Sequence, residues 1–182
     1  MALKPTIYKV QVQLADSDRH CYEDLALTIA LHPSETLERM TARLLAFCLN
    51  AGPGLAFTRG LSSTDEPDLW QHSDSGEIEH WLEVGQPDEG RLRKACGRAQ
   101  RVSVYTFASS TETWWSLNGE QIGKLPRLAV WQLPWEEVEA AATLIERTTQ
   151  LSASIAGGVI YLDNGSSSQT IEPRQLLAAE PG

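Results

Sequence analysis

The sequence predicts one α/β domain, a mixed β-sheet flanked by helices with a β-hairpin at each end of the chain. Three observations support this fold class. Polar and apolar residues alternate near both ends, as they do in half-buried strands. In the middle, β-branched segments alternate with segments of helical periodicity, which is typical of a mixed sheet covered by helices. The length of 182 residues suits one domain, and no repeat or linker divides residues 1–182.

The first half of the chain begins with a predicted hairpin and continues with a helix. "TIYKVQVQLAD" (residues 6–16) alternates strictly, and a polar turn leads to a second strand over residues 22–31. "HPSETLERMTARLLAFCLNAG" predicts a helix over residues 33–50, because Pro33 suits a first turn and Gly52 ends the pattern.

A short hairpin over residues 65–89 precedes the second half, in which helices and strands alternate. The later elements, in order, are a helix from an Asp88 N-cap to about residue 101, a strand over 101–108, a short helix ending near Gly119, a strand over 127–133, a helix over 134–148, and a hairpin turning at Gly157 and Gly158. From Ser166 to residue 182 the chain is polar and contains proline, which predicts a loosely held tail.

Composition limits the function classes. The formal net charge is −9, from 24 acidic against 15 Lys and Arg residues, which counts against a protein bound to nucleic acid at all times. Three isolated cysteines predict neither a disulfide framework nor a zinc knuckle and favour the cytoplasm. No apolar run reaches the roughly 20 residues of a membrane span, and the N-terminus predicts no export signal. We therefore expect no membrane association.

Acidic residues gather at the open end of the short hairpin: Asp65, Glu66, Asp68, Glu83, Asp88 and Glu89. A turn at residues 73–76 would place Asp68 opposite Trp81 and Glu66 opposite Glu83. Asp68 and Glu83 would then be diagonal neighbours on one face. Carboxylates this close repel one another unless they take up protons or share a cation.

Two interpretations of the acidic residues stay open. They are either solvated side chains at the end of a sheet, with Asp88 and Glu89 beginning the next helix, or Asp68 and Glu83 hold a hard cation such as Mg²⁺. Glu38, at the border of the apolar face of the first helix, could reach a shared metal ion, or its side chain could simply extend past apolar neighbours into solvent. On the same helix, Arg39 and Arg43 are predicted to point away from the core.

Basic residues follow on the second helix. Arg91, Lys94, Arg98 and Arg101 lie at i, i+3, i+7 and i+10, on one edge of the helix surface. Such an edge could contact the phosphates of a nucleic acid, or it could be an ordinary solvated face.

The sequence resembles the YaeQ family over essentially its whole length. The runs that carry the resemblance occur in order: "MALKPTIYK", "HPSETLERM", "FTRGL", "DEP", "EVGQPDE" with "RKAC", and "WW" followed by "VW". Proteins of this family are regarded as members of the PD-(D/E)XK nuclease superfamily with a variant strand arrangement.

The resemblance implies a set of site residues. Asp68 matches the first metal-binding acid and Glu83 the second, and Glu38 matches the acid of the first helix, so that all three would hold Mg²⁺. The position of the superfamily lysine, two residues after Glu83, is Gly85. Gln86 or Lys94 would therefore replace that lysine in positioning water, and Arg91, Lys94 and Arg98 would contact phosphates.

Two functions of different classes follow. The first is a magnesium-dependent phosphodiesterase that acts on DNA or RNA. The second is a non-catalytic protein on a nuclease scaffold that binds a protein or nucleic-acid partner. The acidic cluster and the basic edge favour the first, whereas the missing lysine and the net charge of −9 favour the second.

Overall fold

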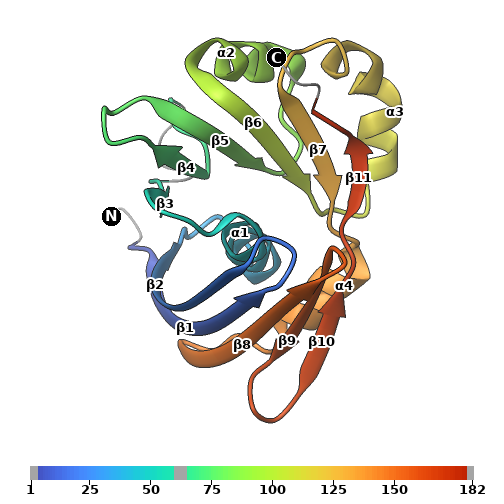
Figure 1. Cartoon of the computed structure of the whole chain (residues 1–182). Coiled ribbons are helices and arrows are strands. Elements are labelled where there is room, and N and C mark those ends of the chain that lie inside the picture. The colour runs from blue at the N-terminus through green and yellow to red at the C-terminus, as the bar shows by residue number, and fades with distance from the viewer. Residues whose placement is uncertain (1–3, 60–64, 180–182) are drawn as a thin grey trace.

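The computed structural model describes residues 4–59 and 65–179, and it contains two mixed sheets instead of the single one predicted. The five-stranded sheet has the order β10-β9-β8-β1-β2 and forms the lower half of the molecule in Figure 1. Its strands are β1 (Thr6–Asp16), β2 (Cys21–Leu31), β8 (Thr148–Ala156), β9 (Val159–Asp163) and β10 (Ser168–Ile171). The β1–β2 and β8–β9 hairpins are those predicted, and a parallel pairing of β1 with β8 joins the two ends of the chain.

The six-stranded sheet has the order β11-β7-β6-β5-β4-β3. Its strands are β3 (Leu55–Phe57), β4 (Leu69–His72), β5 (Ile78–Val84), β6 (Ala99–Thr106), β7 (Leu128–Gln132) and β11 (Arg174–Leu177). The three central strands β5, β6 and β7 are parallel to one another, and the outer strands pair antiparallel. The sequence pattern shows each strand but not which strands pair, which is why two sheets were predicted as one.

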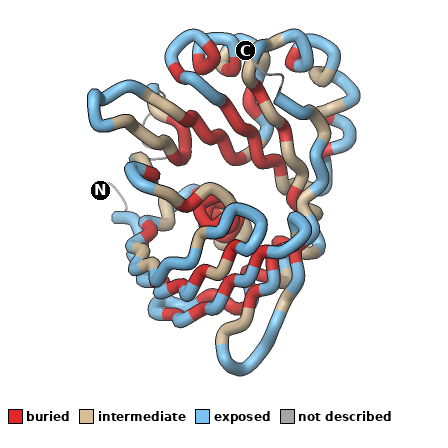
Figure 2. The backbone as a smooth tube through the Cα atoms, viewed as in Figure 1, coloured by how far each residue is buried: buried red, intermediate tan, exposed pale blue. Residues whose placement is uncertain are grey.

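Four helices complete the described chain: α1 (Leu37–Asn50), α2 (Glu89–Arg98), α3 (Thr111–Ile122) and α4 (Trp135–Ala142). Helix α1 lies between the two sheets, and Figure 2 shows it largely buried there. Helices α2 and α3 cover the opposite face of the six-stranded sheet, with a second apolar cluster beneath them. None of the four helices in residues 4–59 and 65–179 has the length and hydrophobicity of a membrane span.

The larger apolar cluster joins both sheets. It contains Val12 and Leu151 of the five-stranded sheet, Leu82 and Tyr105 of the six-stranded sheet, and Leu44 of α1. A core shared in this way makes the two sheets parts of one α/β domain.

Three predicted helix boundaries were wrong. Helix α1 begins at Leu37 after an N-cap at Thr36, instead of at Pro33. Helix α2 ends at Arg98, so Arg101 lies on β6 and not on the helical basic edge. Helix α4 ends at Ala142, because the chain must extend by Thr148 to pair with β1. The predicted N-cap of α2 is confirmed, since the Asp88 side chain accepts a hydrogen bond from the backbone N–H of Arg91.

The tail predicted to be loosely held forms two strands instead. β10 buries Ile171 and pairs with β9, and β11 then crosses to the six-stranded sheet and pairs with β7. The short apolar segments around Ile171 and Leu177 supply the burial that the polar composition of this region obscured. The last three residues of the predicted tail, 180–182, lie outside the described residues.

Candidate functional site

Asp68 lies at the entrance to β4 and is fully engaged in hydrogen bonds. Its Oδ2 accepts from the backbone N–H of Val84 at 2.8 Å, and its Oδ1 accepts from Nη2 of Arg39 at 2.6 Å. Only 4% of the residue is exposed. Asp68 therefore links α1 to the end of β5 and has a counter-charge of its own.

Glu83, near the end of β5, is buried as deeply, and 5% of the residue is exposed. Its Oε1 accepts hydrogen bonds from the Trp81 indole N–H at 2.8 Å and from Nε of Arg91 at 2.7 Å. Burial raises the pKa of the Glu83 carboxyl, as does the charge of Asp68, whereas Trp81 and Arg91 act in the opposite direction.

The second oxygen of Glu83, Oε2, accepts no hydrogen bond within the described chain. Every fully buried side-chain polar atom there has a partner, so Oε2 is within reach of solvent. Glu83 thus keeps one oxygen available for a proton or a cation.

The register of the β4–β5 hairpin differs from the prediction. Leu69 pairs with Leu82 and Trp70 with Trp81, which brings Asp68 opposite Glu83 instead of Trp81. Two extra residues cause the shift. The turn closes between Ser73 and Glu77 around three residues, of which Gly76 has φ +88°, and a bulge follows between Gln71 and His72.

The prediction that two arginines of α1 point away from the core was wrong. Arg43 is buried and binds both carboxylate oxygens of Glu35, at 2.8 and 2.7 Å. Nη1 of Arg39 binds Glu35 at 2.7 Å, while Nη2 of Arg39 binds Asp68. Since α1 lies between two sheets, these side chains have no open face to point to. They form a continuous chain of ion pairs from Arg43 through Glu35 and Arg39 to Asp68.

Glu38 does not join this arrangement. It is half-buried and makes no hydrogen bond or ion pair within the described residues. Within residues 4–59 and 65–179, no three His, Cys, Asp or Glu side chains lie close enough to hold one metal ion. Glu35, which precedes α1, is the acid that is linked to Asp68, because Arg39 forms ion pairs with both. Glu66, predicted to lie near the pair, binds Arg59 at 2.9 Å.

The two residues predicted to position water lie apart from the carboxylates. Gln86 is exposed, and its Nε2 donates to Oγ of Ser110, ahead of α3, at 2.9 Å. Gly85, between Glu83 and Gln86, has φ +127°, a conformation open to glycine. Lys94 is exposed on α2 and has no hydrogen bond or ion pair in the described part of the chain.

A cavity of about 670 Å³ opens beside α2, and the three basic residues predicted for nucleic acid line it. The Arg98 guanidinium lies 5.0 Å from the centre of the Trp81 ring, and its Nη1 donates to the backbone oxygen of Asp65 at 3.0 Å. Arg91 reaches past the cavity to Glu83. Asp68 and Glu83 are not among the lining residues, which include the acids Asp65 and Asp88 beside the three basic residues.

Comparisons with known proteins agree with this sequence and fold. The sequence profile of the YaeQ protein family matches residues 1–173. The chain belongs to the YaeQ family.

Relatives and solved structures extend the YaeQ match over nearly the whole chain. YaeQ of Escherichia coli (strain K12) is 44% identical over 165 residues, which are 90% of this chain and 91% of that protein. YaeQ of Salmonella typhi is 42% identical, over 94% of this chain and 96% of that protein. The crystal structure of YaeQ from Xanthomonas axonopodis pv. citri superposes with a TM-score of 0.92 at 39% identity, over 96% of this chain and 99% of the other. The crystal structure of YaeQ from Pseudomonas syringae superposes with a TM-score of 0.91 at 36% identity, over 96% of this chain and 97% of the other.

Four residues that shape this YaeQ-family site were missed in the sequence: Glu35, Arg39, Arg43 and Trp81. Glu35 and Arg39 stand four residues apart, a spacing that signals an ion pair across the start of a helix. Trp81 stands two residues before Glu83 and so shares its face of the strand. The pairing of Arg39 with Asp68, residues from separate elements, leaves no signal in one sequence.

Proposed function

We propose that this YaeQ-family chain is a PD-(D/E)XK nuclease-like protein that binds single-stranded nucleic acid through the cavity beside α2 without cutting it. The observation that carries the proposal is that Asp68 and Glu83 each have a guanidinium partner, Arg39 for Asp68 and Arg91 for Glu83. The repulsion that would draw a cation between the two carboxylates is already offset by these arginines. The negative charges of Asp68 and Glu83 are therefore balanced by arginines without a metal ion.

Mg²⁺ fits this arrangement poorly. It binds through one or two carboxylates and retains several waters in an octahedral shell. Both oxygens of Asp68 and one oxygen of Glu83 already accept hydrogen bonds, and a third acid is missing from their surroundings in the described residues. Only Oε2 of Glu83 is ready for a ligand bond, so Arg91 or Arg39 would have to leave first.

The cavity beside α2 suits a phosphate backbone better. Arg91, Lys94 and Arg98 face two acids there, Asp65 and Asp88, in a chain whose net charge is −9. Lys94 is the cation in best position for a phosphate, because it has no partner in the described chain. Arg98 is exposed and its Cζ lies 5.0 Å from the centre of the Trp81 ring, which together offer a surface for an unpaired base to stack on. With few contacts and an acidic chain, such binding is weak and sensitive to salt.

A second candidate is the magnesium-dependent nuclease that the resemblance implies, with Mg²⁺ on Asp68 and Glu83 and help from Glu38, Gln86 or Lys94. What favours it is that Glu83 has a raised pKa and a free Oε2 beside Asp68. Perturbed carboxyls of this kind are common at catalytic sites.

We also assign the protein to the cytoplasm, because its three cysteines are free thiols.

The experiment that tests the proposal is the salt dependence of binding to a fluorescent single-stranded oligonucleotide, measured by anisotropy in the presence of EDTA. Lys94→Ala and Arg98→Ala should each weaken binding and reduce the slope of log affinity against log salt by about 0.7. Arg93→Ala is the matched control, since Arg93 is an exposed cation of the same helix outside the cavity. Equal effects of all three variants, or no affinity in the unaltered protein, would contradict the proposal. The second result would leave a protein partner as the alternative.

A further inference from the structure

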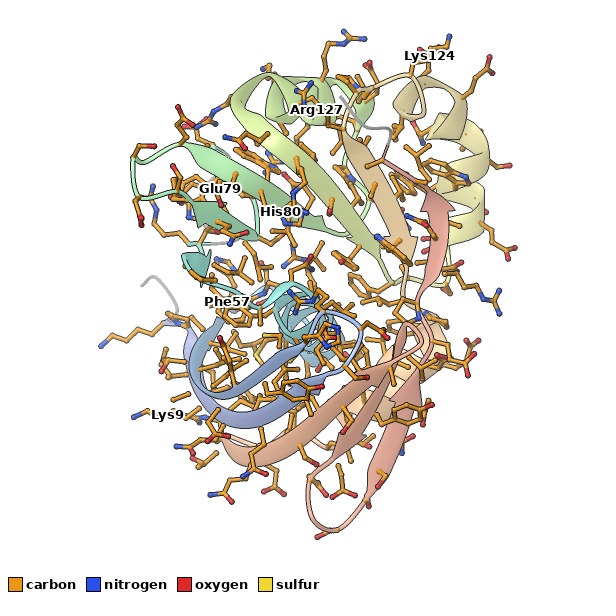
Figure 3. The ribbon with its side chains drawn as sticks, in the orientation of Figure 1. Lys9, Phe57, Glu79, His80, Lys124 and Arg127 are labelled. Carbon is orange, nitrogen blue, oxygen red and sulfur yellow. The ribbon has the colours of Figure 1, made fainter. Side chains whose placement is uncertain are left out.

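A second cavity, of about 410 Å³, lies on the opposite face of the six-stranded sheet, where the two halves of the molecule meet. Its wall includes His80 of β5, Arg101 and Tyr105 of β6, Trp131 of β7 and Asn50 of α1. The β8–β9 turn and residues that flank and follow β11 complete the wall. Figure 3 labels His80 on β5 and Arg127 at the start of β7.

The charge of this cavity is unusual for an acidic chain. Arg101 and Arg127 line it, and no Asp or Glu does. The two arginines are neighbours across adjacent strands, since the backbone N–H of Val102 donates to the carbonyl of Arg127 at 3.1 Å. Arg101 has no counter-charge within the described residues, and an anion bound beside it in the cavity would supply one.

The two arginines differ in freedom. Arg127 is anchored, because its Nε donates to the carbonyl of Gln100 at 3.0 Å and its Nη2 to that of Cys96 at 2.7 Å. Arg101 is exposed and makes no hydrogen bond or ion pair within the described residues. One cation is thus held in place while the other is available to a ligand.

His80 gives the cavity a neutral hydrogen-bonding group. It is 3% exposed, and its Nε2 shares a hydrogen bond with Oγ of Ser103 at 2.7 Å. The other ring nitrogen, Nδ1, has no partner in the described chain, and because no fully buried polar atom there is unpaired, Nδ1 is reachable from the cavity. Burial and the nearby Arg101 lower the pKa of His80 to about 3, so the ring is neutral at physiological pH.

Most of the rest of the wall is apolar or aromatic, with Gln175 as a further polar residue. Leu49, Ala129, Trp131 and Pro173 surround the space, and Nδ2 of Asn50 donates to the Tyr105 hydroxyl at 2.9 Å. A mostly apolar wall with a few convergent polar groups is typical of a small-molecule site, and such sites have volumes of about 300–1,000 Å³.

We propose that this cavity binds a small organic anion, with an aromatic or other apolar body carrying one phosphate or carboxylate group. The anionic group pairs with Arg101 within reach of His80, and the body packs against Trp131. This site is separate from the cavity beside α2, because the sheet stands between them, and it does not rest on the function proposed for that cavity.

The test uses phenyl phosphate and benzoate as anionic probes, benzyl alcohol as a neutral probe of similar shape, and inorganic phosphate as a head group alone. Affinity is measured by isothermal titration calorimetry and checked by the shift in melting temperature. We expect one of the two aromatic anions to bind at least about tenfold more tightly than benzyl alcohol and inorganic phosphate. Which of the two binds more tightly identifies the head group.

Arg101→Ala should weaken the preferred anion by about tenfold or more, since a charged hydrogen bond is lost. Lys124→Ala is the matched control: it removes the same charge from an exposed lysine that Figure 3 shows beyond α3, away from His80. Arg101→Gln repeats the test with less change of shape. Failure of both aromatic anions to bind at millimolar concentration, equal affinity for benzyl alcohol, or equal effects of the Arg101 and Lys124 variants would overturn the proposal.

Discussion

Arg39 and Asp68 form an ion pair at 2.6 Å that ties α1 to the β4–β5 hairpin. The side chains are 17% and 6% exposed, and Arg39 also donates to the carbonyl oxygen of Val84 at 3.0 Å. Asp68 therefore acts here as the acceptor for a largely buried guanidinium. This pairing changes what each carboxylate variant should do.

Asp68→Asn should destabilise the protein. Without Arg39, removing this charge would relieve repulsion with Glu83 and raise the melting temperature. With Arg39 as its partner, the substitution instead removes a carboxylate from a largely buried guanidinium, which keeps Glu35 and the Val84 carbonyl, at a cost of about 3 kcal/mol in the free energy of unfolding. Urea denaturation measures the change, with Asp74→Asn in the exposed turn of the same hairpin as control. A stabilised Asp68→Asn protein would show that repulsion dominates.

Arg91→Ala should create a response to Mg²⁺ that the unaltered protein lacks. Removal of the guanidinium leaves Oε1 of Glu83 with only the Trp81 indole N–H as donor and leaves its charge beside Asp68 uncompensated. A metal ion that binds only the folded state raises the melting temperature through linkage. We expect millimolar Mg²⁺ to raise the melting temperature of the variant by several degrees and to leave the unaltered protein unchanged. A rise of equal size in both would mean that arginine does not occupy the place of the metal.

His80 should make the protein less stable in mild acid. Its pKa is lowered from 6.5 to about 3 by burial and by Arg101, so between these values the unfolded chain binds a proton that the folded chain does not. Stability is therefore lost as the pH falls below 6.5, by on the order of 2 kcal/mol at about pH 5. In His80→Gln this loss should disappear, so the difference between the two denaturation profiles isolates it from the other titrating groups. Parallel profiles would contradict a neutral buried His80.

Gly54→Ala should be more destabilising than Gly76→Ala. Both glycines have positive φ, +83° and +88°, so both variants bear the strain of that conformation, about 1–2 kcal/mol. At Gly54 the new Cβ would also lie 2.6 Å from the backbone oxygen of His72, whereas at Gly76 nothing lies within 4 Å. Thermal denaturation should give the larger loss for Gly54→Ala, and equal losses would show that the backbone near His72 yields.

Local patterns predicted most elements of the fold. Strand alternation located β1 and β2, and the glycine pair at 157–158 located the β8–β9 turn. Pairings between distant segments could not be predicted in the same way. The parallel β1–β8 pair and the crossing of β11 between sheets depend on contacts far apart in sequence.

The sequence predicted which acidic residues lie at the candidate site but not their hydrogen bonds and ion pairs. Asp68 and Glu83 do lie together, although in a register shifted by the three-residue turn and the bulge after Gln71. Arg39 was assigned to a solvated face, because helix periodicity shows one inward stripe and α1 is covered on two sides. The sequence pattern of a helix does not reveal whether the helix packs between two sheets, because that depends on the tertiary structure.

The most direct test of the account is one sample of single-stranded oligonucleotide measured for both binding and cleavage, with EDTA and with millimolar Mg²⁺. We predict the same affinity under both conditions and an intact oligonucleotide, with binding reduced by Lys94→Ala. Cleavage that requires Mg²⁺ and is lost in Asp68→Asn would contradict the account and establish the nuclease instead.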